Sequence, residues 1–420
     1  MIWQQADCQK EVLCGRGTGG VIMHGDLRNA QLEPYYGRVQ CVYLDPPFFT
    51  GDEFTFRMRV GKNGWETGAQ TLVLPAYSDS KTGGKEAYLQ LLCDALEKAH
   101  LLLSDTGALF LHLDSRMNAY ARLLCDEIFG ESNFVNEIIW AYQSGGRAKR
   151  HFSRKHDVIL FYAKSRALYF DITRVGLPRK DNRSNHMRRT VDESGRPCRT
   201  IKTGGKVYTY YDDEPVFPDD VWADVSHLQQ KDPQRTGYDT QKPQALLNRI
   251  VRCCTREGDL VADLFCGSGT TLVAASDNKC RFLGVDASRH AMSVTHKRLL
   301  DTELMVDTPT RPVHAALRAE VLPGLGYYEI TLGDYQLPEG MEQVQQHLPG
   351  VPLTGLDLVD QWEVGFLRDG EFRGYAASAR RKQTPEIDRT LELPLLRGEV
   401  AILVIDVLGN RSVWTAETEE

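Results

Sequence analysis

Residues 260–271 read Leu-Val-Ala-Asp-Leu-Phe-Cys-Gly-Ser-Gly-Thr-Thr, an apolar run followed by glycines at positions 267 and 269. The run has the length and composition of a buried strand, and residues 270–278 continue in a helical pattern. Glycines at a strand-to-helix turn permit a tight bend and let a ligand approach the backbone closely. The stretch predicts a strand, a ligand-binding turn and a helix within a layered α/β domain.

The residues around the two glycines narrow the choice of ligand. No lysine follows the turn, which disfavours a phosphate-cradling loop, and the dinucleotide fingerprint would need glycine where Leu272 stands. Asp286 ends the next predicted strand, where it could accept hydrogen bonds from ribose hydroxyls. The turn therefore favours a nucleoside ligand without a bulky pyrophosphate, and an ordinary glycine-rich turn is the alternative.

Outward from this stretch, strand-like and helix-like segments alternate, which indicates a mostly parallel sheet covered by helices. Apolar runs predict strands at residues 39–44, 108–113, 133–140, 157–163, 260–264 and 281–286. Helical spacing predicts helices at residues 85–103, 243–254, 270–278 and 288–300.

A second motif, Leu44-Asp45-Pro46-Pro47-Phe48, follows a predicted buried strand. Two prolines stiffen the chain here, so that the Asp45 carboxylate and the Pro46 carbonyl can be held as a fixed pair of acceptors. Such a pair suits the two protons of an amine on a nucleobase, and the ring of Phe48 offers an extruded base a stacking surface. The alternative is a stiff strand exit with a solvated aspartate.

Together the two motifs resemble motifs IV and I of the amino-methyltransferases that modify DNA bases. Their order, Asp-Pro-Pro-Phe first and Phe-Cys-Gly-Ser-Gly later, resembles the β group of that family. Further likenesses are His24-Gly25-Asp26-Leu27, residues 133–140, residues 156–165 and Thr240-Gln241-Lys242-Pro243. The resemblance covers roughly residues 21–300 and extends to type III modification subunits, although this chain is shorter than those and has Phe48 where tyrosine is commoner.

The resemblance implies a Rossmann-like methyltransferase core and S-adenosylmethionine as the methyl donor. It implies catalytic roles for Asp45, Pro46, Pro47 and Phe48. It implies cofactor contacts from Asp26, Lys242, Asp263, Phe265, Gly267, Gly269, Thr270 and Asp286. No metal site is expected.

Several functions stay open under this resemblance. The aspartate at position 45 favours sequence-specific methylation of adenine N6, and cytosine N4 is the alternative. Carbon-5 methylation of cytosine would need a nucleophilic cysteine, and the only Pro-Cys pair, at Cys198, does not follow a predicted core strand. A non-catalytic DNA-binding protein with a disabled methylase core is the alternative from another class.

Basic residues concentrate in one part of this otherwise acidic chain. Residues 144–206 hold 17 lysines and arginines against 5 acidic residues, a local charge of +12 in a chain of net charge −7. This asymmetry is typical of a polyanion-binding segment, and a solvated insert is the alternative. We expect double-stranded DNA as the partner and Arg147, Lys149, Arg150, Arg154 and Lys155 as phosphate contacts.

The patterns divide the chain into four parts. Residues 1–164 and 240–305 are expected to form the core, with a target-recognition insert at residues 165–239. Hairpin turns such as Asp369-Gly370 predict a small, sandwich-like all-β domain at residues 318–420. We expect a cytoplasmic protein with reduced cysteines and no membrane partner. A homodimer and a restriction or defence-system partner stay open.

Overall fold

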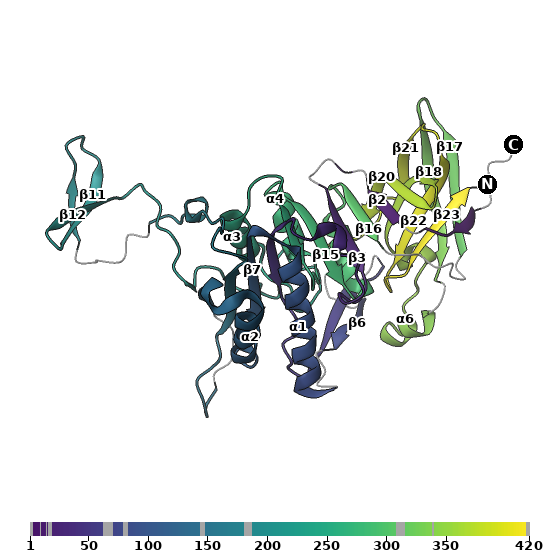
Figure 1. Ribbon diagram of the computed structural model, residues 1–420. Helices are drawn as coiled ribbons and strands as arrows, with labels where there is room; N and C mark the ends of the chain where they lie inside the picture. Colours follow the sequence, from purple (N-terminus) through teal and green to yellow (C-terminus); the bar gives the residue numbers. More distant parts are fainter. Residues whose placement is uncertain are drawn as a thin grey trace.

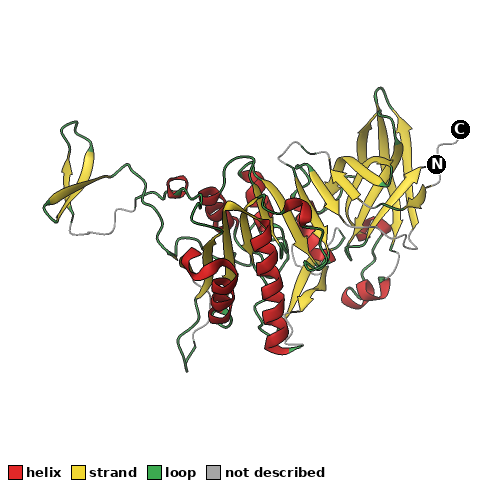
Figure 2. Cartoon of the chain, in the orientation of Figure 1, coloured by secondary structure: helices red, strands yellow, loops and turns green. Residues whose placement is uncertain are grey.

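The computed structural model describes residues 3–8, 10–13, 15, 19–61, 70–78, 83–142, 148–179, 187–307, 316–337 and 340–416. Its dominant feature is a 15-stranded sheet that runs through the core and into the β-rich part of the molecule (Figure 1). One half of this sheet forms an α/β core, and the other half forms part of a β domain (Figure 2).

The core half is parallel in its centre, as predicted. Its strands follow the order β16-β3-β15-β14-β4-β7-β9-β8-β13, with parallel pairing from β16 to β7 and antiparallel pairing of β9 with β7 and β8. The bounds are β3 Gly20–His24, β4 Val39–Leu44, β7 Leu103–Leu113, β8 Phe134–Ala141, β9 His156–Ala163, β13 Val221–Trp222, β14 Leu260–Asp263, β15 Arg281–Asp286 and β16 Leu304–Asp307. These strands confirm all six strand predictions for the core to within a few residues, except that β7 begins five residues early.

Helices cover both faces of this core, because its strands carry apolar side chains on each face. In β4, Cys41 and Tyr43 join one hydrophobic cluster while Val42 and Leu44 join the other. The first cluster includes side chains of α3 (Gln244–Cys254) and α4 (Thr270–Asp277), and the second those of α1 (Gly84–Leu102) and α2 (Asn118–Cys125). The predicted helices are confirmed, and α5 (Arg289–Arg298) lies beside the β domain.

The β domain contains strands from both ends of the chain. Five strands of the large sheet share one hydrophobic core with a separate three-stranded sheet, order β17-β18-β21. The bounds are β1 Trp3–Ala6, β2 Lys10–Leu13, β17 Ala316–Pro323, β18 Tyr327–Gln336, β19 Val359–Arg368, β20 Glu371–Ala379, β21 Thr390–Pro394, β22 Glu399–Asp406 and β23 Arg411–Ala416. The short helix α6 (Met341–His347) packs against the same core.

The prediction that residues 1–164 belong wholly to the methyltransferase core is therefore wrong at its start. Strand β1 pairs with β23, and β2 lies between β20 and β16, where it joins the β domain to the core. The buried side chains of Glu11 and Arg411 form an ion pair beside this junction. Sequence patterns missed this arrangement because pairing between strands at opposite ends of a chain leaves no local signal.

Strands also occur within the insert at residues 165–239, where no strand was predicted. Strands β10 (Arg188–Val191), β11 (Pro197–Thr203) and β12 (Lys206–Tyr211) form a three-stranded sheet that projects from the core as an arm (Figure 1). A second addition, the hairpin of β5 (Glu53–Arg59) and β6 (Thr71–Ser78), follows the Asp-Pro-Pro-Phe motif.

Three observations concern only the residues that the structure describes. All nine described cysteines are free thiols. Within the same ranges, no group of three or more metal-binding side chains gathers at one point. Among the described helices, none combines the length and the apolar character needed to cross a membrane.

Candidate active site

A cavity of about 430 Å³ opens where the carboxyl ends of β3, β4, β14 and β15 meet. Its volume lies within the range of small-molecule sites, and the carboxyl edge of a parallel sheet is where such sites form. Nine residues predicted to be functional line it: Asp26, Asp45, Pro47, Lys242, Asp263, Phe265, Gly267, Thr270 and Asp286. Both motifs therefore meet at one cavity, although they are more than 200 positions apart in the sequence.

The turn between β14 and α4 has a backbone that requires its two glycines. Gly267 has φ of +51° and donates its N–H to Asp286 over 2.7 Å. Gly269 has φ of +73° and precedes α4, and a Cβ there would lie 2.6 Å from the Thr295 hydroxyl. A side chain at position 269 would meet both backbone strain and a steric clash.

Two carboxylates hold this turn in place. Asp263 accepts hydrogen bonds from the Phe265 N–H at 3.0 Å and the Thr271 hydroxyl at 2.6 Å, and removal from water raises its pKa to about 7. Asp286 accepts N–H groups of Gly267 and Ser288, and desolvation raises its pKa to about 6. Because an ionised carboxylate has about four acceptor positions, Asp286 can still accept hydrogen bonds from a ligand.

Helix α5 supports the turn from its other side. The Thr295 hydroxyl donates to the Gly267 carbonyl at 3.0 Å, and the Arg298 guanidinium donates to the Ser268 carbonyl at 2.7 Å. Lys297, between them, forms an ion pair with Asp360 of β19. Helix α5 therefore contacts the turn through Thr295 and Arg298, and contacts the β domain through Lys297.

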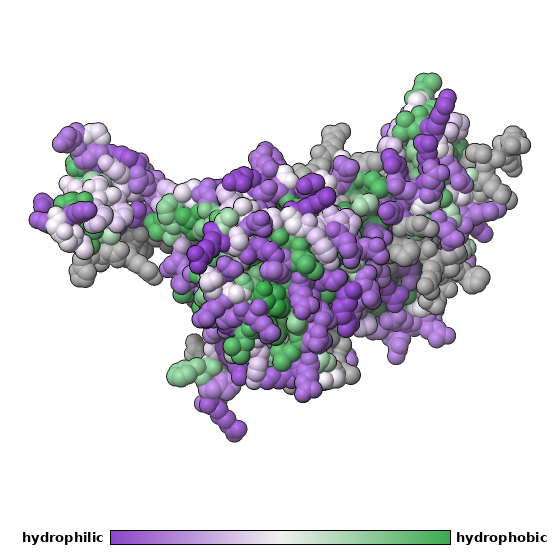
Figure 3. Space-filling model, viewed as in Figure 1, coloured by the Kyte–Doolittle hydropathy of each residue, from purple (hydrophilic) through white to green (hydrophobic). Residues whose placement is uncertain are grey.

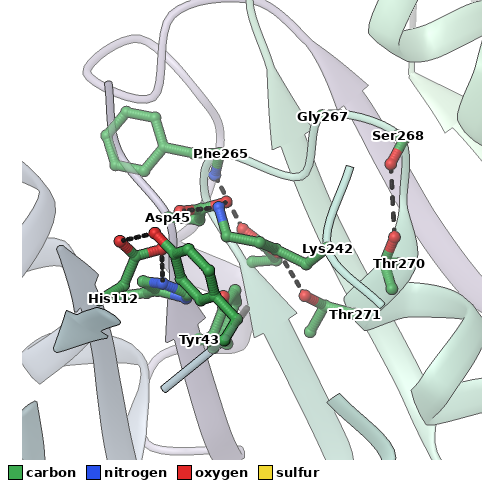
Figure 4. Close-up of polar contacts among 12 residues, drawn as sticks. Tyr43, Asp45, His112, Lys242, Phe265, Gly267, Ser268, Thr270 and Thr271 are labelled. Carbon is green, nitrogen blue, oxygen red and sulfur yellow. Dashed lines mark hydrogen bonds and ion pairs between the residues drawn. The ribbon is translucent and has the colours of Figure 1, made fainter. Parts of the chain in front are cut away.

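Asp45 forms an ion pair with Lys242 that the sequence did not predict. The ammonium lies 2.8 Å from Oδ1 and 2.5 Å from Oδ2 of the carboxylate, and Figure 4 shows the two side chains pointing toward each other. The resemblance implies a cofactor contact for Lys242, whereas its contact in the structure is the Asp45 carboxylate. Lys242 also lies over the ring of Phe48, 4.9 Å from its centroid.

A buried polar network lies beside this pair. The Tyr43 hydroxyl is 2.7 Å from Nδ1 of His112, whose Nε2 is 3.2 Å from Asp157 (Figure 4 shows the first contact). Asp157 in turn accepts the hydroxyl of Tyr142 at 3.0 Å, and the His112 ring lies 5.9 Å from that of Phe48. The sequence analysis missed this network, although a histidine within an apolar strand is a signal that could have indicated it.

Some predicted residues lie outside the cavity lining. Pro46 is buried, and Phe48 packs on His112 and Lys242 rather than lining the cavity. Gly269 does not line the cavity, and its positive φ shapes the turn between β14 and α4. Asp26 lines the cavity and forms an ion pair with Arg28.

The predicted DNA-contacting residues lie in the loop between β8 and β9. Lys149, Arg150 and Arg154 are exposed, Lys155 is partly exposed, and Arg147 lies outside the described residues. The structure brings these four described residues together on one loop.

Residues 39–297 match a protein-family model described as "DNA methylase". The match covers well over half of the chain and includes both motifs, the insert and all of helix α5 except its last residue, Arg298. The chain belongs to this DNA methylase family.

This DNA methylase is similar to several curated proteins. It is 27% identical over 309 residues to the type II methyltransferase M.EcaI of Enterobacter cloacae, a match covering 62% of this chain and 64% of that protein. It is 23% identical to the DNA adenine methyltransferase YhdJ of Escherichia coli, covering 66% and 82%. It is 24% identical to the Mod subunit of the type III restriction-modification enzyme StyLTI of Salmonella typhimurium, covering 58% and 47%. Two of these matches span less than two thirds of the relative.

The family match leaves out both ends of this methylase. Asp26, strand β3 and the β domain lie outside residues 39–297. The match therefore includes every catalytic and cofactor residue predicted above except Asp26, and it gives no information on the β domain.

Proposed function

We propose that this methylase transfers a methyl group from S-adenosylmethionine to the exocyclic amine of adenine, N6, at specific sequences in double-stranded DNA. The observation that carries the proposal is the meeting of Asp45 with the Gly267–Gly269 turn at one cavity. One motif supplies acceptors for an amine, and the other supplies a site shaped for a nucleoside.

The residues of the cavity fit S-adenosylmethionine. Asp286 retains acceptor positions for ribose hydroxyls, and the Gly267 N–H of the turn donates to this carboxylate rather than being left free for a pyrophosphate. Asp26 and Phe265 line the same space, and Gly267 lies beside Tyr238, whose ring would lie 3.5 Å from a Cβ at position 267. When bound, the cofactor supplies an electrophilic methyl group on a sulfonium sulfur.

Asp45 and Pro46 prepare the target amine as nucleophile. The amine lone pair is delocalised into the base, so the nitrogen gains nucleophilicity when its two protons are drawn into hydrogen bonds. One amine proton is hydrogen-bonded to a carboxylate oxygen of Asp45, and the other is hydrogen-bonded to the Pro46 carbonyl. Once methylated, the nitrogen would lose one proton to Asp45 or to water. No covalent bond to the protein is required.

The extruded base stacks on Phe48, whose ring is held by His112 and Lys242. The projecting sheet of β10, β11 and β12 is proposed to read the target sequence, because it extends beyond the core and carries basic side chains. Adenine is favoured by Asp45 and by similarity to a relative named as an adenine methyltransferase; cytosine N4 is the second candidate base.

Similarity to a Mod subunit supports a place within a restriction-modification or related defence system. A second copy of this chain or a restriction subunit would then be its protein partner.

The test is methylation of unmodified genomic DNA by the purified protein, followed by nucleoside mass spectrometry and single-molecule sequencing. We expect N6-methyladenine at one recurring sequence, and none with Asp45→Ala. N4-methylcytosine would replace the base assignment, and no methyl transfer by the wild-type protein would refute the proposal.

A further inference from the structure

Phe152 is a large apolar residue whose side chain does not pack into the protein. Its side chain is 97% exposed, which makes it the most exposed of the described phenylalanines. It lies in the loop between β8 and β9, and its neighbours Arg150, His151 and Arg154 are all exposed. An aromatic ring fully in water among positive charges is typical of a surface that binds nucleic acid bases and phosphates together.

The topology of the sheet places this loop at the edge that holds Asp45. Strands β4 and β7 are parallel, β9 is antiparallel to β7, and β8 is antiparallel to β9. The carboxyl ends of β4 and β8 therefore lie at the same edge of the sheet. Asp45 follows β4, and the loop follows β8 and projects beyond the body of the core (Figures 1 and 2).

The base of the loop is joined to the network beside Asp45. The Tyr142 N–H donates to the Lys155 carbonyl at 2.9 Å, which closes the loop, and the Tyr142 hydroxyl donates to Asp157. Asp157 contacts His112, against which Phe48 packs. A DNA duplex gripped by the loop would therefore lie against the surface where the extruded base is to stack.

Extrusion of a base leaves a gap in the duplex, and the lost stacking is unfavourable unless another group fills the space. We propose that Phe152 inserts into the duplex and stacks in the gap that the target base leaves, while Lys149, Arg150 and Arg154 hold the adjoining phosphates. Figure 3 shows the projecting loop carrying both hydrophilic and hydrophobic side chains, as this dual role requires. This inference rests on the proposed function and adds the residue that stabilises the extruded state.

The test compares Phe152→Ala with Phe152→Trp on a duplex of the target sequence found by single-molecule sequencing. With 2-aminopurine at the target position, extrusion raises fluorescence. We expect Phe152→Ala to lower both this rise and the methylation rate at saturating DNA by roughly tenfold, the scale of one lost aromatic–base stack. Phe152→Trp should keep both within about threefold on the same scale, because indole also stacks.

Two further measurements separate stacking from general binding. A mismatch opposite the target base lowers the cost of extrusion, so it should restore most of the rate lost in Phe152→Ala. The salt dependence of DNA binding should stay unchanged, because no phosphate contact is removed. The control is Leu325→Ala, which truncates a fully exposed side chain in the turn between β17 and β18 and should change nothing.

Wild-type fluorescence and rate in Phe152→Ala would overturn the inference, as would an equal defect on matched and mismatched duplexes. A change in concentration-dependent sedimentation with unchanged fluorescence would also overturn it and would assign Phe152 to a contact between copies of the chain. The failure of wild-type protein to methylate any DNA would instead refute the proposed function.

Discussion

One ammonium group, that of Lys242, contacts both carboxylate oxygens of Asp45, which lies 197 positions earlier in the chain. Both oxygens of this carboxylate, one of which is proposed to accept a hydrogen bond from the target amine, are therefore engaged before a base arrives. A base that enters must share or replace one of these contacts. Lys242 thus belongs to the machinery that positions the carboxylate.

Asp45→Asn should reduce methyl transfer by about a hundredfold or more, the cost of removing one preorganised electrostatic contact to a reacting group. Cofactor affinity should change by less than about twofold, since the transition-state contact and the cofactor contacts are distinct. Radiolabelled methyl transfer and calorimetric titration measure the two effects. Transfer within a few-fold of the wild-type rate would show that another residue holds the amine.

Lys242→Met should lower kcat, because the Asp45 carboxylate loses the partner that fixes its orientation. We expect about a tenfold loss, corresponding to about 1.4 kcal/mol, with a smaller change in the dissociation constant of the cofactor. Steady-state kinetics with each substrate in turn separates the two effects. The opposite pattern, a weaker cofactor with unchanged kcat, would return Lys242 to the cofactor role that the resemblance implies.

Cofactor binding should weaken in acid through Asp286. Its pKa is raised to about 6, so the carboxylate is half protonated near pH 6 and loses its charge below that pH. If the ionised form accepts ribose hydroxyls, affinity should fall by about tenfold between pH 7 and pH 5. Calorimetry across this range measures the fall. Asp286→Asn should abolish the fall in cofactor affinity near pH 6. Asp263→Asn removes the neighbouring group with a pKa of about 7 and should leave that fall in place.

Neutralising Lys149, Arg150, Arg154 and Lys155 together should lower the steepness of the log-affinity versus log-salt plot for duplex DNA. Each lost phosphate contact contributes about 0.9 to the slope, and we expect a drop of roughly two units or more. Fluorescence anisotropy at several salt concentrations gives the slope. Neutralising Arg368 and Arg397, two exposed residues of the β domain, is a control for removing positive charge from another surface. Equal slopes in all three proteins would mean that DNA is held elsewhere.

Gly269→Ala should destabilise the folded chain by about 1–3 kcal/mol, because alanine meets both a positive φ and the Thr295 side chain. Thermal unfolding measures the loss, and cofactor should give less stabilisation than in the wild type. Gly195→Ala is a control for backbone strain alone, since Gly195 has φ of +83° with open space around its Cβ direction. A smaller loss at position 269 than at position 195 would contradict the steric argument.

The core could be predicted because its strands and motifs are visible in short, continuous stretches of sequence. The strands at residues 39–44 and 260–263 are mostly apolar runs, and each motif lies at the carboxyl end of its strand, so a parallel sheet must bring both to one edge. The contacts of Lys242 and His112 were not predictable in this way. Each contact depends on the directions of side chains from different elements. A single sequence does not specify which of its residues come into contact.

The basic region and the β domain were predicted less well for a related reason. Strands β10 to β12 are polar and exposed on most positions, so they lack the hydrophobic alternation that reveals a strand. Strands β1 and β2 are four residues each, and their partners lie at the far end of the chain. Short strands with distant partners are recognised only when the sheet is assembled.

The pairing of Trp3 with Ala416 and of Glu11 with Arg411, 400 positions later, also has a consequence for biosynthesis. A ribosome releases the first strands long before β20, β22 and β23 leave its exit tunnel. Until then β1 and β2 keep open backbone edges that can pair with other nascent chains. The catalytic core can fold during translation, but the edge of β1 is paired only once β23 emerges. Removing the residues after position 410, which include β23, would leave that edge permanently unpaired. Such a change should yield aggregated protein rather than a smaller methylase.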